Sequence, residues 1–297
     1  PMKRNALLLG AFGVLLIVAY LVLQKPGEMS SSGESTGRLF EIDSLAVDKI
    51  EITTAALGLL LEKKDVEWFI ERPLSDKADP AAVANAIHQA RTLDVSGIVS
   101  SNPEKHPVFQ VDSSGTAVTV YEKGSAKGSF VVGKVGPGFT DTYVRDAGSN
   151  DVSSVTGTFG YVFNRALREW RNKAISTVPE ESIKEVKFQF GDTTFTLVYK
   201  DTVWVIGKDI ADMSVTQSLV GGLSTVTVDD FIDSTLSPLP KITAQISYAG
   251  QQIRFAFSKT LTKYYVQTSA SPRWYVMEPW RANSLLKRKN ELIKSAK

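Results

Sequence analysis

The chain contains no cysteine among its 297 residues. This absence excludes disulfide bonds, a thiolate nucleophile, a zinc–thiolate site and a lipid-modified cysteine. The folded part of the chain must therefore be stabilised by burial of apolar side chains. With 43% hydrophobic residues, the composition is sufficient for an ordinary core.

Histidine is almost as scarce, with only His88 and His106. His88 lies in an expected helix, and His106 lies in a loop bounded by prolines. A metal site needs several converging ligands, and a histidine base needs a nucleophile nearby. Neither pattern occurs, and the aspartates lack the regular spacing of a calcium loop. The sequence therefore predicts no catalytic residue, no metal, no cofactor and no enzymatic activity.

Excess charge of one sign is also lacking. Removing Lys3 and Arg4 from the 34 basic residues leaves 32, which equals the 32 acidic residues. A general nucleic-acid-binding protein would show a strongly basic surface. The charge balance therefore argues against a nucleic-acid partner.

One long apolar run is present, from Ala6 to Leu23, and it follows Lys3 and Arg4. Eighteen residues in a helix span about 27 Å, close to the hydrocarbon thickness of a membrane. We expect residues 1–24 to form a transmembrane anchor that contacts lipid through residues 6–23. The basic residues predict a cytoplasmic N-terminus and a periplasmic C-terminal part, held at the inner membrane in a single pass.

A cleaved signal peptide is the alternative interpretation, because signal peptides also begin with basic residues. Residues 20–24 offer no site with small residues at the required spacing, which favours an uncleaved anchor. Residues 25–38 are rich in serine and glycine and predict a flexible tether.

The remaining chain repeats its own pattern. Residues 47–52, 57–62 and 66–70 read as strands, and a helix then begins at Pro80 with Asp79 as its N-cap. The same order returns in the second half. Trp204 follows Trp68 by 136 positions, and Asp212 follows Asp79 by 133. A tandem duplication explains this agreement in residue type, order and spacing.

Further strands and a closing helix complete each predicted unit. The first unit adds strands near residues 117–121, 129–132, 142–145 and 151–155 and a helix near 159–170. The second adds strands near 242–248, 253–257, 263–267 and 273–277 and a helix near 280–293. The strands alternate apolar and polar residues, which is typical of antiparallel sheets with one wet face. We therefore predict an α+β fold, with repeat units at residues 39–178 and 179–297 after the transmembrane helix.

The chain resembles the domain-of-unknown-function 4340 family over roughly residues 39–295. The matching segments are residues 39–50, Trp68-Phe69-Ile70, Ala78-Asp79-Pro80, Ser101-Asn102-Pro103, Gly133 to Gly138, Tyr143-Val144-Arg145 and Trp170-Arg171. The resemblance implies a membrane-tethered extracytoplasmic protein of the bacterial envelope, often associated with auxiliary components of ABC-type export systems. The family supplies no catalytic residues to transfer.

Two tryptophan–arginine pairs are candidate partner-binding residues, Trp170 with Arg171 and Trp280 with Arg281. Both residue types are enriched at protein interfaces. The alternative is that each tryptophan packs the closing helix onto its sheet, with the arginine stem covering it. Lys287 and Arg288 extend the second pair into a basic C-terminal stretch. An anionic membrane surface, an acidic partner and simple packing within the unit all remain open for that stretch.

The leading hypothesis is a non-enzymatic, membrane-anchored periplasmic accessory or scaffold protein. Its expected partner is an ABC-type permease or an auxiliary subunit of such a system. The second hypothesis is an extracytoplasmic module that binds a glycan or lipid in a cleft between the two repeat units.

Overall fold

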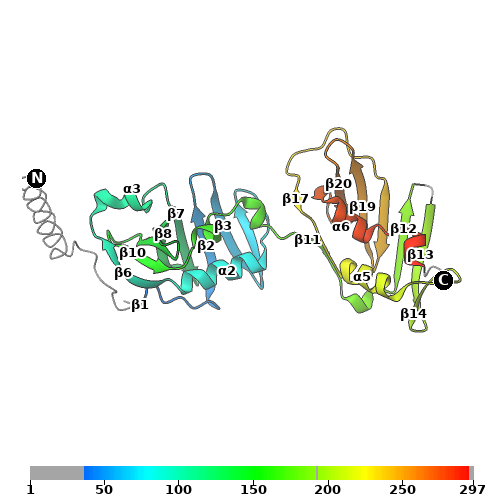
Figure 1. The fold of residues 1–297 in the computed structure, drawn as a ribbon, viewed down its shortest axis with the longest axis horizontal. Helices are drawn as coiled ribbons and strands as arrows, with labels where there is room; N and C mark the ends of the chain where they lie inside the picture. Colours follow the sequence, from blue (N-terminus) through cyan, green and yellow to red (C-terminus); the bar gives the residue numbers. More distant parts are fainter. Residues whose placement is uncertain (1–36, 192, 294–297) are drawn as a thin grey trace, which may run out of the picture. The chain divides into compact units, whose positions relative to one another are not determined.

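The computed structural model describes residues 37–191 and 193–293. Its first sheet contains ten strands in the spatial order β1-β6-β10-β9-β8-β7-β2-β3-β4-β5 and is mainly antiparallel (Figure 1). The strands are β1 (Gly37–Arg38), β2 (Val47–Thr53), β3 (Gly58–Lys64), β4 (Glu67–Arg72), β5 (Asp76–Lys77), β6 (Asp94–Ser100), β7 (Thr116–Glu122), β8 (Ser125–Val135), β9 (Asp141–Asp146) and β10 (Val152–Thr156).

A nine-stranded sheet follows, in the order β15-β14-β13-β12-β18-β19-β20-β21-β17. Its strands are β12 (Glu185–Phe190), β13 (Thr193–Lys200), β14 (Val203–Ile206), β15 (Asp209–Ile210), β17 (Asp230–Phe231), β18 (Ala244–Tyr248), β19 (Gln251–Ser258), β20 (Lys263–Thr268) and β21 (Tyr275–Met277). A separate pair joins β11 (Ala174–Thr177) to β16 (Thr225–Thr227).

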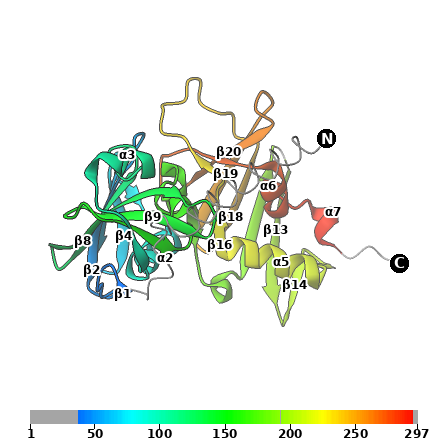
Figure 2. The same cartoon turned by 60° about the vertical axis from the view of Figure 1, so that its left-hand side comes forward.

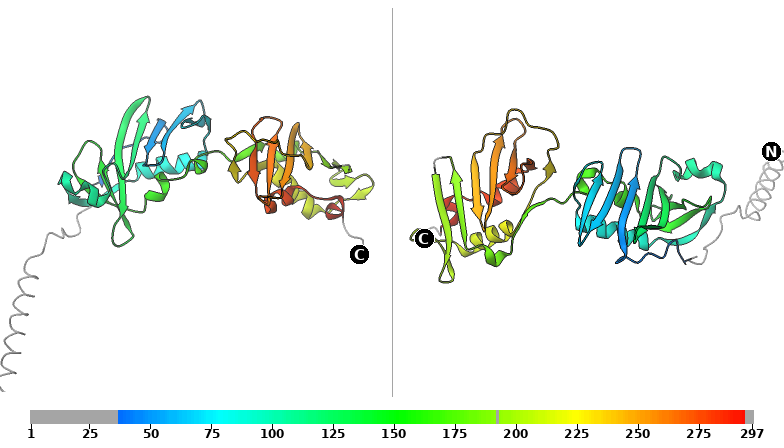
Figure 3. Two further views of the ribbon diagram at one scale, coloured as in Figure 1. Left: turned by 90° about the horizontal axis from the view of Figure 1, so that it is seen from above. Right: turned by 180° about the vertical axis from the view of Figure 1, so that it is seen from behind.

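The helices are short, and the two longest have 12 residues each. They are α2 (Pro80–Arg91), α3 (His106–Phe109), α4 (Gly160–Phe163), α5 (Met213–Ser224), α6 (Pro279–Leu285) and α7 (Lys289–Leu292), with 3-10 turns η1 (Pro103–Lys105), η2 (Leu167–Glu169) and η3 (Glu180–Ser182). Helices α5 and α6 lie on the same face of the nine-stranded sheet (Figure 3).

The chain divides into two compact units. The first contains described residues up to Lys64 together with Ala84–Arg165, and the second contains Asp65–Val83 together with the described residues from Ala166 onward. In the second unit, strand β12 alternates exposed and buried residues, so that Val186, Phe188 and Phe190 face the core. Leu219 and Leu223 of α5 and Leu285 of α6 pack into the same core. Figure 2 shows helices α5 and α6 beside the strands of this sheet.

Apart from the additional edge strand β1 of the first sheet, both sheets have one topology. Listed from one edge, β5-β4-β3-β2-β7-β8-β9-β10-β6 in the first corresponds to β15-β14-β13-β12-β18-β19-β20-β21-β17 in the second. The register agrees as well, because Ile50 pairs with Leu61 in the first sheet and Val186 pairs with Leu197 in the second, each 136 positions later.

The same backbone hydrogen bonds recur where the main helix of each repeat begins. The amide of Ala78 donates to the Trp68 carbonyl, and the amide of Ala211 donates to the Trp204 carbonyl, at 2.8 Å in both cases. The Asp79 and Asp212 side chains then cap α2 and α5 by accepting backbone N–H groups of the first turn.

The closing segments are shorter and more broken than the sequence predicts. The expected helix near 159–170 is split into α4 and η2, and the one near 280–293 is split into α6 and α7. In each case a glutamate side chain caps the start of the second helical segment. Glu169 accepts the Ala166 amide at 3.3 Å, and Glu291 accepts the Arg288 amide at 2.7 Å. These local caps favour a new turn over a continuous helix.

The predicted α+β class is therefore corrected to a mainly antiparallel β architecture with a few short helices. Besides the split helices, the sequence prediction missed β6, a strand of seven residues, and the short strands β1, β5, β11, β15, β16 and β17. Strand β6 begins directly after α2 and contains Ser96 and Gly97, so it lacks a clean alternation of apolar residues.

The structural finding also corrects the predicted membrane class and inner-membrane, periplasmic location. Across residues 37–191 and 193–293, no helix is long and apolar enough to cross a membrane. The longest helices, of 12 residues, span about 18 Å, well short of a bilayer's hydrocarbon core. The segment predicted as an anchor and lipid contact, residues 6–23, lies outside the described residues, as does nearly all of the predicted tether.

Candidate functional site

Histidine and carboxylate side chains do not gather into a metal site in the described part of the chain. His88 is exposed on α2. His106 begins α3, and its Nε2 lies 3.0 Å from the carbonyl oxygen of Asn150. Each histidine thus lies at the surface, and His106 connects two neighbouring loops.

Trp170 and Arg171, predicted as partner-binding residues, lie inside the second unit with exposures of 0% and 2%. The Trp170 carbonyl accepts the Asp79 amide at 2.7 Å, and Arg171 forms a backbone bridge with Ala78. In this conformation neither side chain offers surface to a partner.

Arg171 instead forms the centre of an ionic cluster. Its Nε donates to Asp76 Oδ2 at 2.7 Å, and its Nη2 lies 2.7 Å from the same oxygen, without hydrogen-bond alignment. Its Nη1 donates to Asp233 at 2.7 Å. Arg273 donates to Asp76 Oδ2, also at 2.7 Å. We refer to Asp76, Arg171, Asp233 and Arg273 as the Arg171 cluster.

The Arg171 cluster explains how a guanidinium group is tolerated at 2% exposure. Two arginines face two aspartates, so the formal charges balance within the cluster. The face of the Phe231 ring also lies against the guanidinium, with 3.7 Å between the Arg171 Cζ and the ring centroid. Hydrogen bonds and a cation–π contact therefore replace the water that Arg171 has lost.

Trp280 and Arg281 are placed differently from the first pair. Trp280 is 66% exposed on α6, and the Arg281 Cζ stacks 4.5 Å from a Trp280 ring centroid. Arg281 also donates to both carboxylate oxygens of Asp229, at 3.0 and 3.2 Å, and to the Thr227 hydroxyl at 2.7 Å. Arg281 is thus fixed by its own unit, while Trp280 remains available at the surface.

These contacts determine the ionisation of Asp229. Partial burial raises the pKa of Asp229, but hydrogen bonds from Arg281 and from the Glu278 amide, with the charges of Arg281 and Lys173, outweigh it. The net result is a pKa below the usual 3.8. The folded state thus favours the ionised carboxylate.

The lowered pKa predicts an acid-dependent contribution to stability. The contribution of Asp229 is complete above the unfolded carboxyl's pKa and disappears as the pH falls through the lower native pKa. We expect Asp229→Asn to flatten the pH dependence of the free energy of unfolding below about pH 4. Urea unfolding at a series of pH values measures this. Thr227→Val removes another Arg281 contact without removing a carboxylate, and it should leave the slope intact. An unchanged slope in Asp229→Asn would contradict the assignment.

Lys287 and Arg288 lie in the break between α6 and α7. The Arg288 Cζ lies 3.9 Å from the Phe190 ring centroid, and the Arg288 amide is held by Glu291. Lys287 is half-buried. Among the six predicted residues, a stacking contact joins Trp280 and Arg281, whereas the side chains of Arg171 and Arg288 contact residues outside the predicted set.

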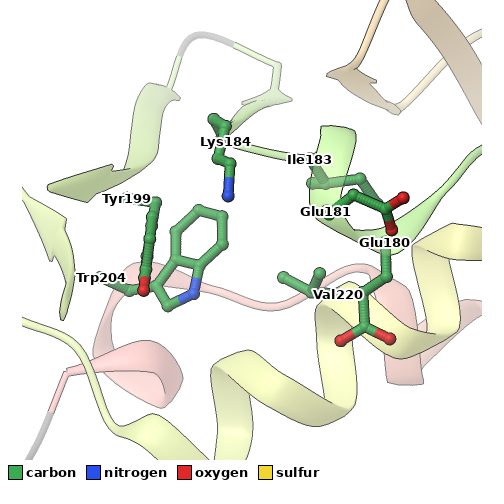
Figure 4. Close-up of a pocket in the computed structure, with 7 residues that line it drawn as sticks. All are labelled: Glu180, Glu181, Ile183, Lys184, Tyr199, Trp204 and Val220. Carbon is green, nitrogen blue, oxygen red and sulfur yellow. The ribbon is translucent and has the colours of Figure 1, made fainter. Parts of the chain in front are cut away.

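The structure also reveals a groove that the sequence did not predict. It has a volume of about 380 Å³ and lies in the second unit, between η3, the β13–β14 hairpin and α5 (Figure 4). Two aromatic, two aliphatic and three charged side chains line it, namely Tyr199, Trp204, Ile183, Val220, Glu180, Glu181 and Lys184. We refer to it as the Trp204 groove.

The two aromatic rings lie side by side in this groove. Tyr199 and Trp204 are direct partners across the β13–β14 hairpin, and their ring centroids are 5.3 Å apart. The Lys184 Nζ lies 4.8 Å from the Tyr199 ring centroid. Figure 4 shows the Lys184 ammonium beside the indole, with Glu181 beside Ile183 and Glu180 beside Val220 on the far side.

Local structure explains this arrangement. The two-residue turn Asp201–Thr202 has positive φ at both positions and brings Tyr199 opposite Trp204. The η3 turn, closed by a 2.6 Å bond from the Ser182 hydroxyl to the Pro179 carbonyl, places Glu180 and Glu181 at the rim. Sequence reasoning used Trp204 only to recognise the repeat. The signal available in the sequence was the placement of Tyr199 and Trp204 on opposite sides of a two-residue turn, at equal distances from it. This placement predicts that the two side chains share one surface of the hairpin.

Two mainly antiparallel β units of one topology define the structural class of this chain. A family model described as "Domain of unknown function (DUF4340)" matches residues 68–245, which is more than half of the chain. The chain belongs to this family, as its sequence resemblance predicted. No curated protein and no solved structure matched significantly.

Proposed function

We propose that this protein is a non-enzymatic accessory protein that binds a protein component of an ABC-type transport complex. The observation that carries the proposal is one exposed aromatic side chain at the same place in both repeats. Tyr161 on α4 is 67% exposed, and Trp280 on α6 is 66% exposed.

The two positions are equivalent by backbone geometry. Each aromatic is the second residue of a helix that follows the strands of its sheet, after N-cap residues Phe159 and Glu278. The Val162 amide donates to the Phe159 carbonyl, and the Arg281 amide donates to the Glu278 carbonyl. Each helix is followed by the glutamate cap described above.

Packing within the protein does not explain why these two positions carry large aromatic side chains, because both side chains lie mostly in solvent. Tyrosine and tryptophan supply most of the binding energy in many protein interfaces, since they bury a large area at a low cost in conformational entropy. Arg281 fixes one face of Trp280, which lowers that cost further. Two exposed aromatic contact points are suited to a scaffold that engages a folded partner.

Site-specific photocrosslinking tests this function. A photoreactive phenylalanine at position 161 or 280 of the full chain, produced in cells, is expected to crosslink to a subunit identifiable by mass spectrometry as part of an ABC-type transporter. Leu45 and Leu239, which are 88% and 71% exposed, provide control positions. Adducts of equal yield at the controls, or adducts with no transport component, would contradict the proposal. Trp280→Ala should weaken co-purification of the same subunit more than about tenfold.

A further inference from the structure

We propose that the Trp204 groove binds a neutral oligosaccharide, with one sugar ring packed against the Trp204 and Tyr199 side chains. This inference is independent of the accessory role, because Tyr161 and Trp280 do not line the groove. Four properties of the groove lead to this ligand class.

The first property is an aromatic surface that is open to solvent. Tyr199 is 37% exposed, and Trp204 is half-buried beside it. Beneath them lie Ile183 and Val220, at 1% and 5% exposure, so the floor is rigid and apolar. The apolar face of a sugar ring can pack on such a surface, while its hydroxyl groups point toward the rim.

The second property is a set of polar groups whose bonding capacity is unused. In the described part of the chain, the Glu180 and Glu181 carboxylates have no hydrogen bond or ion pair. The Lys184 ammonium contacts only the Tyr199 ring, and the Trp204 indole N–H has no protein acceptor. A ligand with many hydroxyl groups would satisfy both the acceptors and the donors.

The third property is charge of both signs within one small groove. Glu180 and Glu181 disfavour an anionic ligand, and Lys184 disfavours a cationic one. A neutral ligand with hydroxyl groups can bind to both without repulsion. The volume of about 380 Å³ lies within the usual range of roughly 300–1,000 Å³ for small-molecule sites.

The fourth property is that the repeated fold does not require these side chains. At the register offset of 136, Lys184 corresponds to Asp48 and Tyr199 corresponds to Lys63, whereas Trp204 corresponds to Trp68. Asp48 accepts the Gly124 amide at 2.7 Å, whereas the Lys184 ammonium lies over the Tyr199 ring, inside the groove. The shared tryptophan therefore belongs to the fold, and the groups around it are particular to the second repeat.

Isothermal titration calorimetry on the purified full chain tests the inference. The neutral probes are maltotetraose and the tetramer of N-acetylglucosamine; the charged probes are an oligogalacturonate and an oligomer of glucosamine. We expect at least one neutral tetrasaccharide to bind at millimolar concentration or below. Tyr199→Ala and Lys184→Ala are each expected to weaken that binding more than tenfold.

The controls separate loss of the ligand site from loss of the fold. Phe139→Ala also removes an exposed aromatic ring, 81% exposed and outside the groove, and should leave binding unchanged. Circular dichroism melting of each variant confirms that it is folded, and Lys184→Ala removes no buried group. Absence of binding by both neutral probes, tighter binding of a charged probe, or equal binding by Tyr199→Ala and the unmodified chain would overturn the inference.

Discussion

Replacing Arg171 by alanine is expected to lower the free energy of unfolding by about 3–5 kcal/mol. The substitution leaves Asp76, which is only 17% exposed, with Arg273 as its remaining cationic partner. It also leaves Asp233 without its arginine and removes the guanidinium from the face of Phe231. The large expected effect follows from leaving two aspartates with a single arginine at a partly buried site, not from a large net gain when the cluster forms. Urea unfolding monitored by circular dichroism measures the loss.

A surface arginine three positions earlier provides the matched control. Arg168 lies 3.7 Å from Asp230, and these side chains are 59% and 45% exposed. Because water screens such a pair, Arg168→Ala should change the free energy of unfolding by less than about 1 kcal/mol. If both alanine variants were equally stable, the Arg171 cluster would have no special role in the second unit.

Phe188→Ala is expected to destabilise the second unit by about 3–5 kcal/mol. Phe188 is 0% exposed on β12, and its ring centroid lies 4.9 Å from that of Phe195 and 6.2 Å from that of Phe190. Removal of the ring loses its transfer energy and leaves a cavity among stacked aromatic groups, which cannot all move to fill it. The same urea measurement applies.

The same substitution at an exposed position separates burial from residue type. Phe257 lies on β19 of the same sheet but is 41% exposed. Its replacement by alanine should therefore cost far less than the replacement of Phe188, since less apolar area returns to water. Hydrogen exchange of the β12 and β18 amides should increase in Phe188→Ala and remain near the original rate in Phe257→Ala. Equal destabilisation by the two substitutions would contradict the assigned core.

The two repeats share one backbone frame but fill it with different side chains. The strand bridge between Ala78 and Arg171 has its counterpart between Ala211 and Ile293. The residue before the bridge is Trp170 in one case and Leu292 in the other, and the carbonyl of each accepts an aspartate amide at 2.7 Å. A position that carries a buried arginine in one repeat thus carries an aliphatic residue in the other.

This correspondence revises the sequence interpretation of the tryptophan–arginine pairs. The sequence predicted one role for Trp170-Arg171 and Trp280-Arg281, that of candidate partner-binding pairs, but the two pairs do not occupy equivalent places. The hydrogen bonds instead match Trp170 with Leu292, and Trp280 with Tyr161. The equivalence is defined by backbone pairing, and pairing partners far apart in the chain are not visible in a local pattern.

The sequence by itself determined the local features of this protein. Alternation of apolar and polar residues located most strands, aspartate caps located the starts of α2 and α5, and a fixed spacing aligned the repeats. These features depend on neighbours within a few residues, where the periodicity and hydrogen bonding of the chain are directly readable.

Only the tertiary structure decided which side chains meet. Asp76 bonds Arg171 and Arg273 across separations of 95 and 197 residues, and these contacts turn a predicted binding arginine into a buried one. Sheet pairing likewise added β6, and packing brought the Trp204 groove together from η3, a hairpin and α5. The physical reason is that burial and charge pairing depend on the packed neighbours of each group, and folding selects those neighbours from the entire chain.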